Sequence, residues 1–197
     1  FRSFPDQIPA AIPQNKSNGA FEILETETGI QVHLKAASTN ATLSKINRVV
    51  LVIQTTDSTP DYQPKVNEAV YILNPRGVGE TSWTKRNPPN YVERSHVLLG
   101  QTVGEGRIWD IAASARYLKQ THGNDIPLLI SAEGKGAVLA AYAALFEPAI
   151  NELSLTQPVV SHMKTHGPQL LNVLRVCDVP DVLGALAPKP LKLFDFD

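Results

Sequence analysis

Residues 132–136 have the types and the spacing of a turn that could present a catalytic nucleophile. They read Ala-Glu-Gly-Lys-Gly and lie between a short apolar stretch and a longer apolar stretch. In the pattern Gly-x-Ser-x-Gly, a serine stands on a tight turn between a buried strand and a buried helix, and the outer positions must be small because they crowd each other. Ala132 and Gly136 meet that demand. Gly134 takes the central position, and because glycine has no hydroxyl group it cannot attack a carbonyl carbon.

The same turn could support other chemistry. Backbone N–H groups at the start of the following helix could hold an anion or a carbonyl oxygen, which Lys135 would favour and Glu133 would oppose. A nucleotide phosphate could also bind there, but neither Gly-x-x-x-x-Gly-Lys-Ser/Thr nor Gly-x-Gly-x-x-Gly is present. Ser131 could be a displaced nucleophile. It stands at the end of the strand, before the turn, so a core serine is the favoured interpretation.

The histidines and the cysteine do not complete a catalytic set. His162 and His166 have the i, i+4 spacing of metal ligands on a helix, but the Gly-Pro that follows favours a loop and no glutamate accompanies them. His162 stays a candidate base because it could lie near the C-terminal edge of the strands. His96 and His122 are expected in turns, and Cys177 as a buried, unreactive thiol. We therefore expect no metal site and no cofactor.

The composition is that of one soluble globular domain. Hydrophobic residues make up 43% of the 197 residues and charged residues 19%. The formal net charge of −1 gives no reason to expect a nucleic acid or an anionic membrane as partner. No apolar run approaches the roughly 20 residues that span a bilayer. The chain begins at Phe1, with neither an initiator methionine nor the apolar segment of a signal peptide, so we expect a piece of a longer protein.

The hydrophobic pattern predicts an α/β fold. Two alternating stretches flank Gly29 and indicate a hairpin, and the β-branched runs at 49–53 and 69–73 are typical of strands covered on both faces. Helical and strand patterns then alternate. Helices are expected at 108–118, 137–146, 169–175 and 181–187, and strands at 127–131, 150–155 and 190–194. This order favours a three-layer sandwich with a mostly parallel, twisted sheet, helices on both faces and an N-terminal antiparallel hairpin.

The N-terminal segment differs from the rest of the chain. Residues 1–18 contain three prolines and show no periodicity, so we expect a linker or an arm. Residues 19–197 are expected to form the α/β domain.

Several segments resemble acetyl-xylan-esterase-like serine hydrolases of the α/β-hydrolase superfamily. Residues 74–81, Asn-Pro-Arg-Gly-Val-Gly-Glu-Thr, are similar to that family's Asp-x-Arg-Gly-x-Gly-x-Ser loop. Residues 107–110 match its Arg-x-x-Asp pattern, and residues 178–191, which include Ala-Leu-Ala-Pro-Lys-Pro, resemble the helix that enters the strand before the catalytic acid. The resemblance covers roughly residues 20–195. It implies an α/β-hydrolase fold with the nucleophile turn at 132–136.

The resemblance also implies what this chain lacks. Gly134 replaces the family's serine, and the family's acid would follow the last expected strand, where Asp195 and Asp197 stand. The family's histidine follows a further strand, beyond the end of this sequence. We therefore expect a degenerate domain, a pseudoenzyme, that acts as an accessory module of a larger carbohydrate-esterase-type hydrolase. Its partner would be the catalytic domain of the same parent protein or a partner chain, with carbohydrate as a candidate ligand. The resemblance favours a secreted or periplasmic location.

Two alternatives stay open. An active esterase with an altered site, or one completed by a partner, would use Ser131 or a group from elsewhere. A binding module would hold a carbohydrate or a small anion over the turn, beside Lys135. Ester hydrolysis and ligand titration distinguish these hypotheses.

Overall fold

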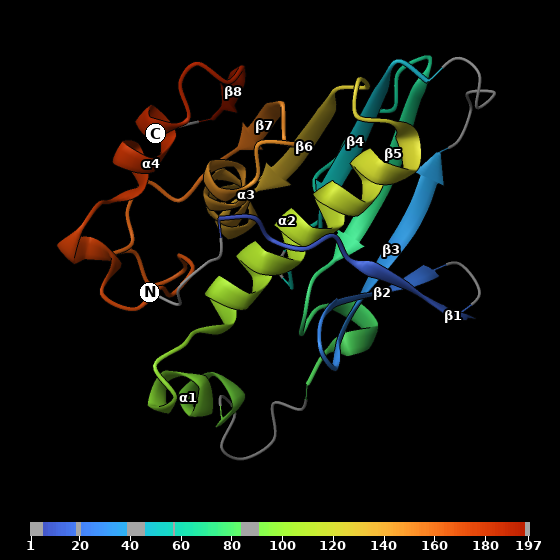
Figure 1. The fold of residues 1–197 in the computed structure, drawn as a ribbon. Coiled ribbons are helices and arrows are strands. Elements are labelled where there is room, and N and C mark those ends of the chain that lie inside the picture. Colours follow the sequence, from blue (N-terminus) through green and yellow to red (C-terminus); the bar gives the residue numbers. More distant parts are fainter. Residues whose placement is uncertain (1–5, 19–20, 39–45, 57, 84–90, 196–197) are drawn as a thin grey trace.

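A single eight-stranded sheet organises the chain (Figure 1). The computed structural model describes residues 6–18, 21–38, 46–56, 58–83 and 91–195. The strands follow the order β1-β2-β3-β5-β4-β6-β7-β8 across the sheet. Their bounds are β1 Ile12–Asn18, β2 Phe21–Glu27, β3 Ile30–Ser38, β4 Arg48–Ile53, β5 Glu68–Asn74, β6 Leu128–Glu133, β7 Glu152–Thr156 and β8 Leu191–Phe194. The pairs β1–β2, β2–β3 and β3–β5 are antiparallel, whereas β4–β5, β4–β6, β6–β7 and β7–β8 are parallel. The mostly parallel sheet with an N-terminal hairpin confirms the predicted fold class.

Two long helices build the main core on one face of the sheet. They are α2 Val103–His122 and α3 Lys135–Phe146, and the shorter helices are α1 Tyr91–Leu98, α4 Val179–Ala185 and the 3-10 turns η2 Gly79–Thr81 and η3 Val173–Arg175. A capping box starts α2, because Thr102 Oγ1 accepts from the Glu105 N–H and the Glu105 carboxylate accepts from the Thr102 N–H. Among the described residues, no helix combines the length and the apolarity needed to cross a membrane.

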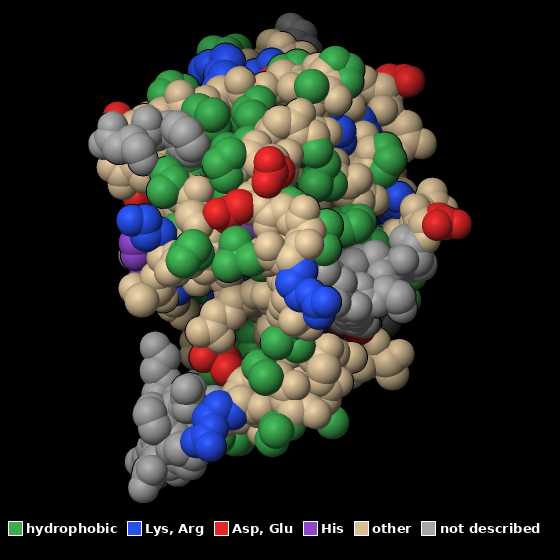
Figure 2. All heavy atoms as spheres, turned by 90° about the vertical axis from the view of Figure 1, so that its left-hand side faces the viewer, with side chains coloured by type: hydrophobic (Ala, Val, Ile, Leu, Met, Phe, Trp, Pro, Cys, Tyr) green, Lys and Arg blue, Asp and Glu red, His purple; other side chains and the backbone are tan. Residues whose placement is uncertain are grey.

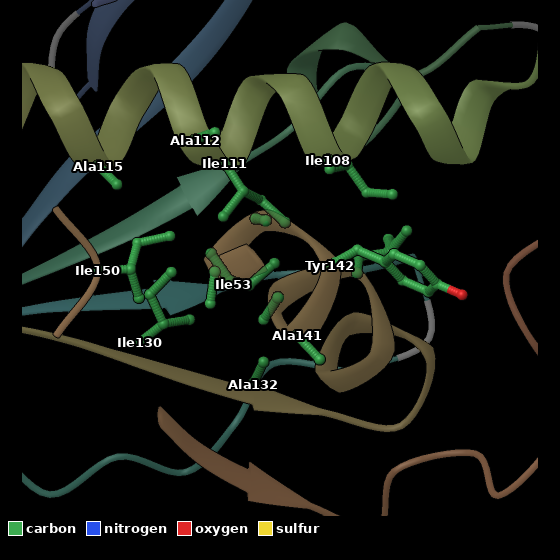
Figure 3. Close-up of a cluster of buried hydrophobic side chains, with 14 of the residues drawn as sticks. Ile53, Ile108, Ile111, Ala112, Ala115, Ile130, Ala132, Ala141, Tyr142 and Ile150 are labelled. Atoms are coloured by element: carbon green, nitrogen blue, oxygen red, sulfur yellow. The ribbon is translucent and has the colours of Figure 1, made fainter. Parts of the chain in front are cut away.

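The core between these helices and the sheet is apolar and closely packed. Figure 3 shows Ile111 of α2 directed toward Ile53 of the sheet, and Ile108 of α2 above Tyr142 of α3. All four side chains are buried. The alanines of α2 and α3 let the two helices approach each other and the sheet, as in other close helix–sheet packing.

The opposite face of the sheet carries a smaller apolar cluster. Val50, Val52, Val70 and Leu129 form it, and Tyr62 packs against its edge together with Ile72. No helix within the described ranges contributes to this cluster. A helix was expected to cover this face, but the connection between β4 and β5 forms no helix in its described part. The non-helical segment that contains Tyr62 packs there instead.

The interpretation of residues 1–18 as a linker or an arm is wrong for its second half. Residues 12–18 form β1, which hydrogen-bonds to β2 at the edge of the sheet. Before it, Ile8 and Ala11 are buried, and the Ala11 N–H donates to the Ala113 carbonyl of α2. Pro13 is tolerated because an edge strand has backbone groups that need no partner, and the register of β1 shifts between Pro13 and Ser17.

Three local predictions also need correction. Helix α1 was not predicted, because none of its residues is buried and its sequence therefore carries no apolar stripe. His96 accordingly lies in that helix rather than in a turn, and His122 is the last residue of α2. The stretch 169–175 is helical only over the 3-10 turn Val173–Arg175.

Candidate functional site

The turn at the end of β6 has the geometry of a nucleophile turn, with glycine at its apex. Gly134 has φ 56° and ψ −125°, a region that L-residues rarely adopt, and it links β6 directly to the first residue of α3. Its N–H donates to the Thr156 carbonyl of β7 at 3.0 Å, and its carbonyl accepts from the Ala137 N–H at 3.2 Å. A Cβ atom at position 134 would meet no atom within 4 Å. A side chain there would therefore project into open space.

The small residues around the apex are explained by close approach of other segments. A Cβ atom on Gly136 would lie 2.9 Å from Cγ2 of Thr55, in the loop after β4, so a larger residue would force that loop away. Ala132 is fully buried in β6. The need for a small residue at position 136 thus comes from Thr55, and not from the predicted crowding between positions 132 and 136.

A polar crevice lies over the turn. Two cavities of about 230 Å³ and about 440 Å³ share three lining residues: Glu93 of α1, Arg107 of α2 and Lys135 of α3. Arg107 donates from Nε to the Arg76 carbonyl at 3.0 Å, and its guanidinium carbon lies 5.7 Å from the centre of the Trp83 ring. Arg107 is thus held at the crevice wall, and the described part of the shared lining also contains Lys135 and the carboxylate of Glu93.

A buried ion pair fixes the loop that borders this crevice. The Arg76 guanidinium donates to both carboxylate oxygens of Asp110, at 2.8 and 2.7 Å, and to Glu27 at 2.6 Å. The Arg76 N–H and the Thr26 hydroxyl also donate to Asp110, which is fully buried in α2. Burial acts to lower the pKa of Arg76, but the hydrogen bonds and charges of Asp110 and Glu27 raise it above its usual value. The pair therefore anchors the loop.

Glycine makes room within that loop. A Cβ atom on Gly77, where φ is 71°, would overlap the ring of Trp83. The ring therefore lies against the backbone of Gly77, next to Arg107. The sequence segment 74–81, identified by resemblance, thus positions Trp83 and Arg107 at the crevice.

Comparisons with known proteins rest on structure, because no protein-family profile and no curated protein matches the sequence. A Bacteroides fragilis protein assigned as an acetyl xylan esterase superposes with a TM-score of 0.60 at 14% identity, over 95% of this chain and 62% of that one. An acetyl xylan esterase from Paenibacillus sp. R4 gives 0.51 at 12% identity, over 77% and 53%. Esterase 2 from Thermogutta terrifontis gives 0.51 at 11% identity, over 92% and 85%. The chain has the α/β-hydrolase fold.

The chain covers only part of two of these proteins. It spans less than two thirds of the length of the Bacteroides and Paenibacillus proteins. In the pattern Gly-x-Ser-x-Gly the nucleophile stands between a strand and the helix after it, and Gly134 stands between β6 and α3.

The other candidate site residues lie apart from the apex or are engaged elsewhere. Ser131 is within β6, 7% exposed, and pairs in register with Val52 and Ser154 of the neighbouring strands. Asp195 follows β8, is exposed and has φ 49°. Asp197 lies outside the described residues. Neither Ser131 nor Asp195 lines the two cavities that share Lys135, whereas His166 lines the smaller one.

His162 belongs to a separate hydrogen-bonded group. Its Nε2 lies 3.0 Å from the Tyr142 hydroxyl, its Nδ1 lies 3.4 Å from the Pro168 carbonyl, and its backbone N–H donates to Asp178. Figure 3 shows the Tyr142 hydroxyl directed away from the apolar cluster around Ile53. Burial raises the pKa of Tyr142, and its contact with Cys177 raises it further. Cys177 is half-buried rather than buried as predicted.

Loop placement of His162 and His166 is confirmed, since both lie outside helices and strands. In the described part of the chain, no three His, Cys, Asp or Glu side chains gather as metal ligands would. Sequence interpretation missed Glu93, Arg107 and Trp83 as crevice residues. The signal for Arg107 was present in the Arg-x-x-Asp pattern, but nothing in the sequence indicated that it would lie beside Trp83.

Proposed function

We propose that this chain is a non-catalytic α/β-hydrolase domain that serves as an accessory module of a larger carbohydrate-esterase-type hydrolase. The observation that carries the proposal is Gly134: this residue stands at the apex of the turn between β6 and α3 in a conformation with positive φ, and it has no side chain. A serine hydrolase forms a covalent acyl intermediate on an activated hydroxyl. Glycine at the apex offers no atom for that step.

The surroundings of Ser131 support the same proposal. Ser131 is buried inside β6, so an ester carbonyl would have to enter the sheet to reach it. His162 is within hydrogen-bonding distance of Tyr142 and Pro168, and no hydrogen bond joins Ser131 to His162 among the described residues. A nucleophile needs a base within hydrogen-bonding reach.

The exposed edge of the sheet supports the accessory role. In the described residues β8 pairs only with β7, and Leu193 and Phe194 of β8 are exposed, as is Leu145 of α3. Figure 2 shows the face of the molecule that carries α1, α4 and β8, with hydrophobic side chains spread over it. An unpaired apolar edge is a surface that another polypeptide can cover. We propose that the catalytic domain of the parent protein, or a partner chain, covers it.

Hydrolysis of p-nitrophenyl acetate tests the loss of catalysis. We expect no turnover above the buffer rate and no labelling by a fluorophosphonate probe. The Gly134→Ser variant should stay inactive and lose roughly 1–3 kcal/mol of stability, because serine must adopt the strained backbone. Gly134→Ala is its matched control for that strain. Turnover that the fluorophosphonate abolishes would refute the proposal, and retained turnover in Ser131→Ala would place the nucleophile elsewhere.

Deletion from the parent protein tests the accessory role. We expect the parent without this domain to show a lower melting temperature and lower acetyl-ester hydrolysis. Phe194→Asp, a change on the exposed edge, should reproduce part of that loss, whereas Val66→Asp, an equally apolar exposed position, should not. An unchanged melting temperature and activity after deletion would contradict the accessory role.

A further inference from the structure

Exposed apolar side chains gather on the side of the molecule that carries α1. Leu98, the last residue of α1, is 87% exposed, and Leu99 after it is 78% exposed. The segment 157–177, between β7 and α4, also exposes apolar side chains, those of Met163, Leu174 and Val176. Figure 2 looks onto this side, and hydrophobic and basic side chains lie at its surface. A single exposed apolar residue is ordinary, but a group of them indicates an interaction surface.

The linings of two cavities show that α1 and the segment 157–177 lie side by side. Val97 of α1 lines a cavity of about 260 Å³ together with Leu174 and Arg175. Arg94 and Leu98 of α1 line another cavity, of about 280 Å³, together with Gln169. The two elements therefore form one surface. We call it the basic–apolar patch and define it by the exposed residues Tyr91, Arg94, Leu98, Lys164, Leu174 and Arg175.

Helix α1 presents a face that the fold itself does not use. No residue of α1 is buried. Tyr91, Arg94 and Leu98 follow one another at spacings of three and four residues, so they share one face, and all three are exposed. A tyrosine ring, a cation on a long apolar stem and an apolar side chain are the residue types found where a polypeptide meets lipid headgroups. This face therefore suits the boundary between headgroups and acyl chains.

The patch carries an excess of positive charge. In α1 and the neighbouring segment, the basic residues Arg94, Lys164 and Arg175 stand against the single carboxylate of Glu93. In the described part of the chain, no ion pair holds any of these three cations. Asp178, the next carboxylate along the chain, already accepts hydrogen bonds from a serine hydroxyl and two backbone N–H groups. The formal net charge of −1 for the whole chain conceals this local excess.

We propose that the basic–apolar patch binds an anionic lipid surface. Leu98 and Leu174 enter the headgroup region, while Arg94 and Arg175 contact the negative groups of the lipids. The apolar side chains project from two separate elements. A fluid headgroup layer accepts each of them independently, whereas a folded protein partner would need a matching pocket for each. A lipid surface is therefore the occupant that the patch favours.

This inference does not rest on the proposed function. It concerns a different surface, because Figure 1 shows α1 and β8 at opposite ends of the molecule. Phe194→Asp, which tests the exposed edge at β8, should therefore leave lipid binding unchanged. Loss of the accessory role with retained lipid binding would refute the proposed function alone, and the reverse result would refute the lipid inference alone.

Flotation with lipid vesicles tests the inference on the whole chain. One set of vesicles contains only phosphatidylcholine, and in the other phosphatidylserine makes up about one third of the lipid. We expect at least about tenfold tighter binding to the anionic vesicles, because each Lys or Arg near an anionic surface contributes roughly fivefold. Raising the salt from about 0.1 M to about 1 M should remove most of that difference, because charges are then screened beyond about 3 Å. Equal binding to both kinds of vesicle, or binding to neither, would overturn the inference.

Variants assign the charged and the apolar contributions. Arg94→Glu and Arg175→Glu should each weaken binding to anionic vesicles at least about tenfold, because a favourable charge becomes a repulsive one. Leu98→Asp should weaken it about tenfold, because an apolar side chain no longer enters the lipid. Unchanged vesicle binding in both Arg94→Glu and Leu98→Asp would overturn the inference.

Matched controls are available in the loop before β5. Lys65 and Val66 are exposed there, so Lys65→Glu and Val66→Asp make the same changes in charge and polarity away from the patch. They should change vesicle binding by less than about twofold, apart from the small effect of net charge. Circular dichroism and the melting temperature should be the same in all these variants, since every substituted side chain is exposed.

Other occupants of the patch give different results. Sedimentation velocity that detects a dimer, dissociated by Leu98→Asp, together with no vesicle binding would overturn the inference in favour of a second copy of the chain. An acidic amphipathic helical peptide is the probe for a protein partner. Binding of that peptide together with no vesicle binding would overturn the inference in favour of such a partner.

Discussion

The Arg76–Asp110 pair allows a quantitative prediction about what holds the crevice together. Asp110 is fully buried and accepts four hydrogen bonds: three from Arg76 and one from the Thr26 hydroxyl. Replacing Asp110 by asparagine keeps the shape of the side chain but removes its charge. It also places an amide N–H donor opposite the donors of Arg76 and Thr26. Removal of one partner from a buried ion pair costs about 3–5 kcal/mol, because the other charge stays buried without compensation.

We expect Asp110→Asn to lower the free energy of unfolding by about 3–5 kcal/mol. For a chain of this size, about 1 kcal/mol corresponds to roughly 2–4 °C, so the melting temperature should fall by roughly 10 °C. Urea unfolding followed by tryptophan fluorescence measures the first quantity, and scanning calorimetry measures the second. Asp61→Asn, at an exposed aspartate, is the matched control and should change stability by less than about 0.5 kcal/mol.

The reasoning also predicts the behaviour of a double variant. Arg76→Met combined with Asp110→Leu removes both charges, and buried pairs replaced by apolar residues are often neutral in stability. We expect the double variant to be more stable than Asp110→Asn alone, although Glu27 also loses a partner in it. A loss of less than about 1 kcal/mol in the free energy of unfolding of Asp110→Asn would refute the view that uncompensated buried charge dominates. A double variant that loses more than the two single variants Arg76→Met and Asp110→Leu lose together would refute it as well.

Three further predictions concern the elements around the turn. Gly136→Ala should cost about 1–3 kcal/mol in urea unfolding, because its methyl group would press on Thr55; an unchanged midpoint would show that the loop yields freely. Lys189→Met should lower the free energy of unfolding by about 1.5–3 kcal/mol, and the melting temperature by several degrees, because Lys189 donates to three backbone carbonyls at and after the end of α3. An unchanged melting temperature would mean that water takes over these hydrogen bonds. Burial lowers the pKa of His122 in the folded chain, so the unfolded chain binds more protons and the free energy of unfolding falls as pH drops below about 6.5. His122→Asn should make the free energy of unfolding depend less on pH in this range. An unaltered pH profile of stability would contradict the burial effect.

The elements that the sequence predicts correctly are those with a strong local pattern of apolar residues. The β-branched run in β4 and the apolar length of α3 are dictated by burial on all sides, and both elements appear where the sequence predicted them. Strand β1 and helix α1 carry no such pattern. The first holds its place by edge hydrogen bonds to β2, and the second has no buried residue, so neither leaves an apolar period in the sequence.

The candidate site divides in the same way. The turn is local, and its small residues could be identified because a tight strand–helix connection needs them wherever it occurs. The crevice is not local, because Glu93, Arg107 and Lys135 come from three different helices and are brought together only by the packing of α2 against α3 and of the 74–81 loop against α2. Pairings of that kind depend on tertiary contacts that no sequence spacing records.

Gly134 and Gly136 meet two different constraints in the turn between β6 and α3. At position 136 the constraint is packing against Thr55, which concerns the fit between two loops and is independent of any chemistry at the apex. At position 134 the constraint is the backbone conformation alone, because a Cβ atom would touch nothing. Glycine adopts that conformation without the roughly 1–3 kcal/mol of strain that a serine bears. A serine at position 134 would therefore add strain and gain no contact with the described residues, so the packing around the turn favours glycine at this position.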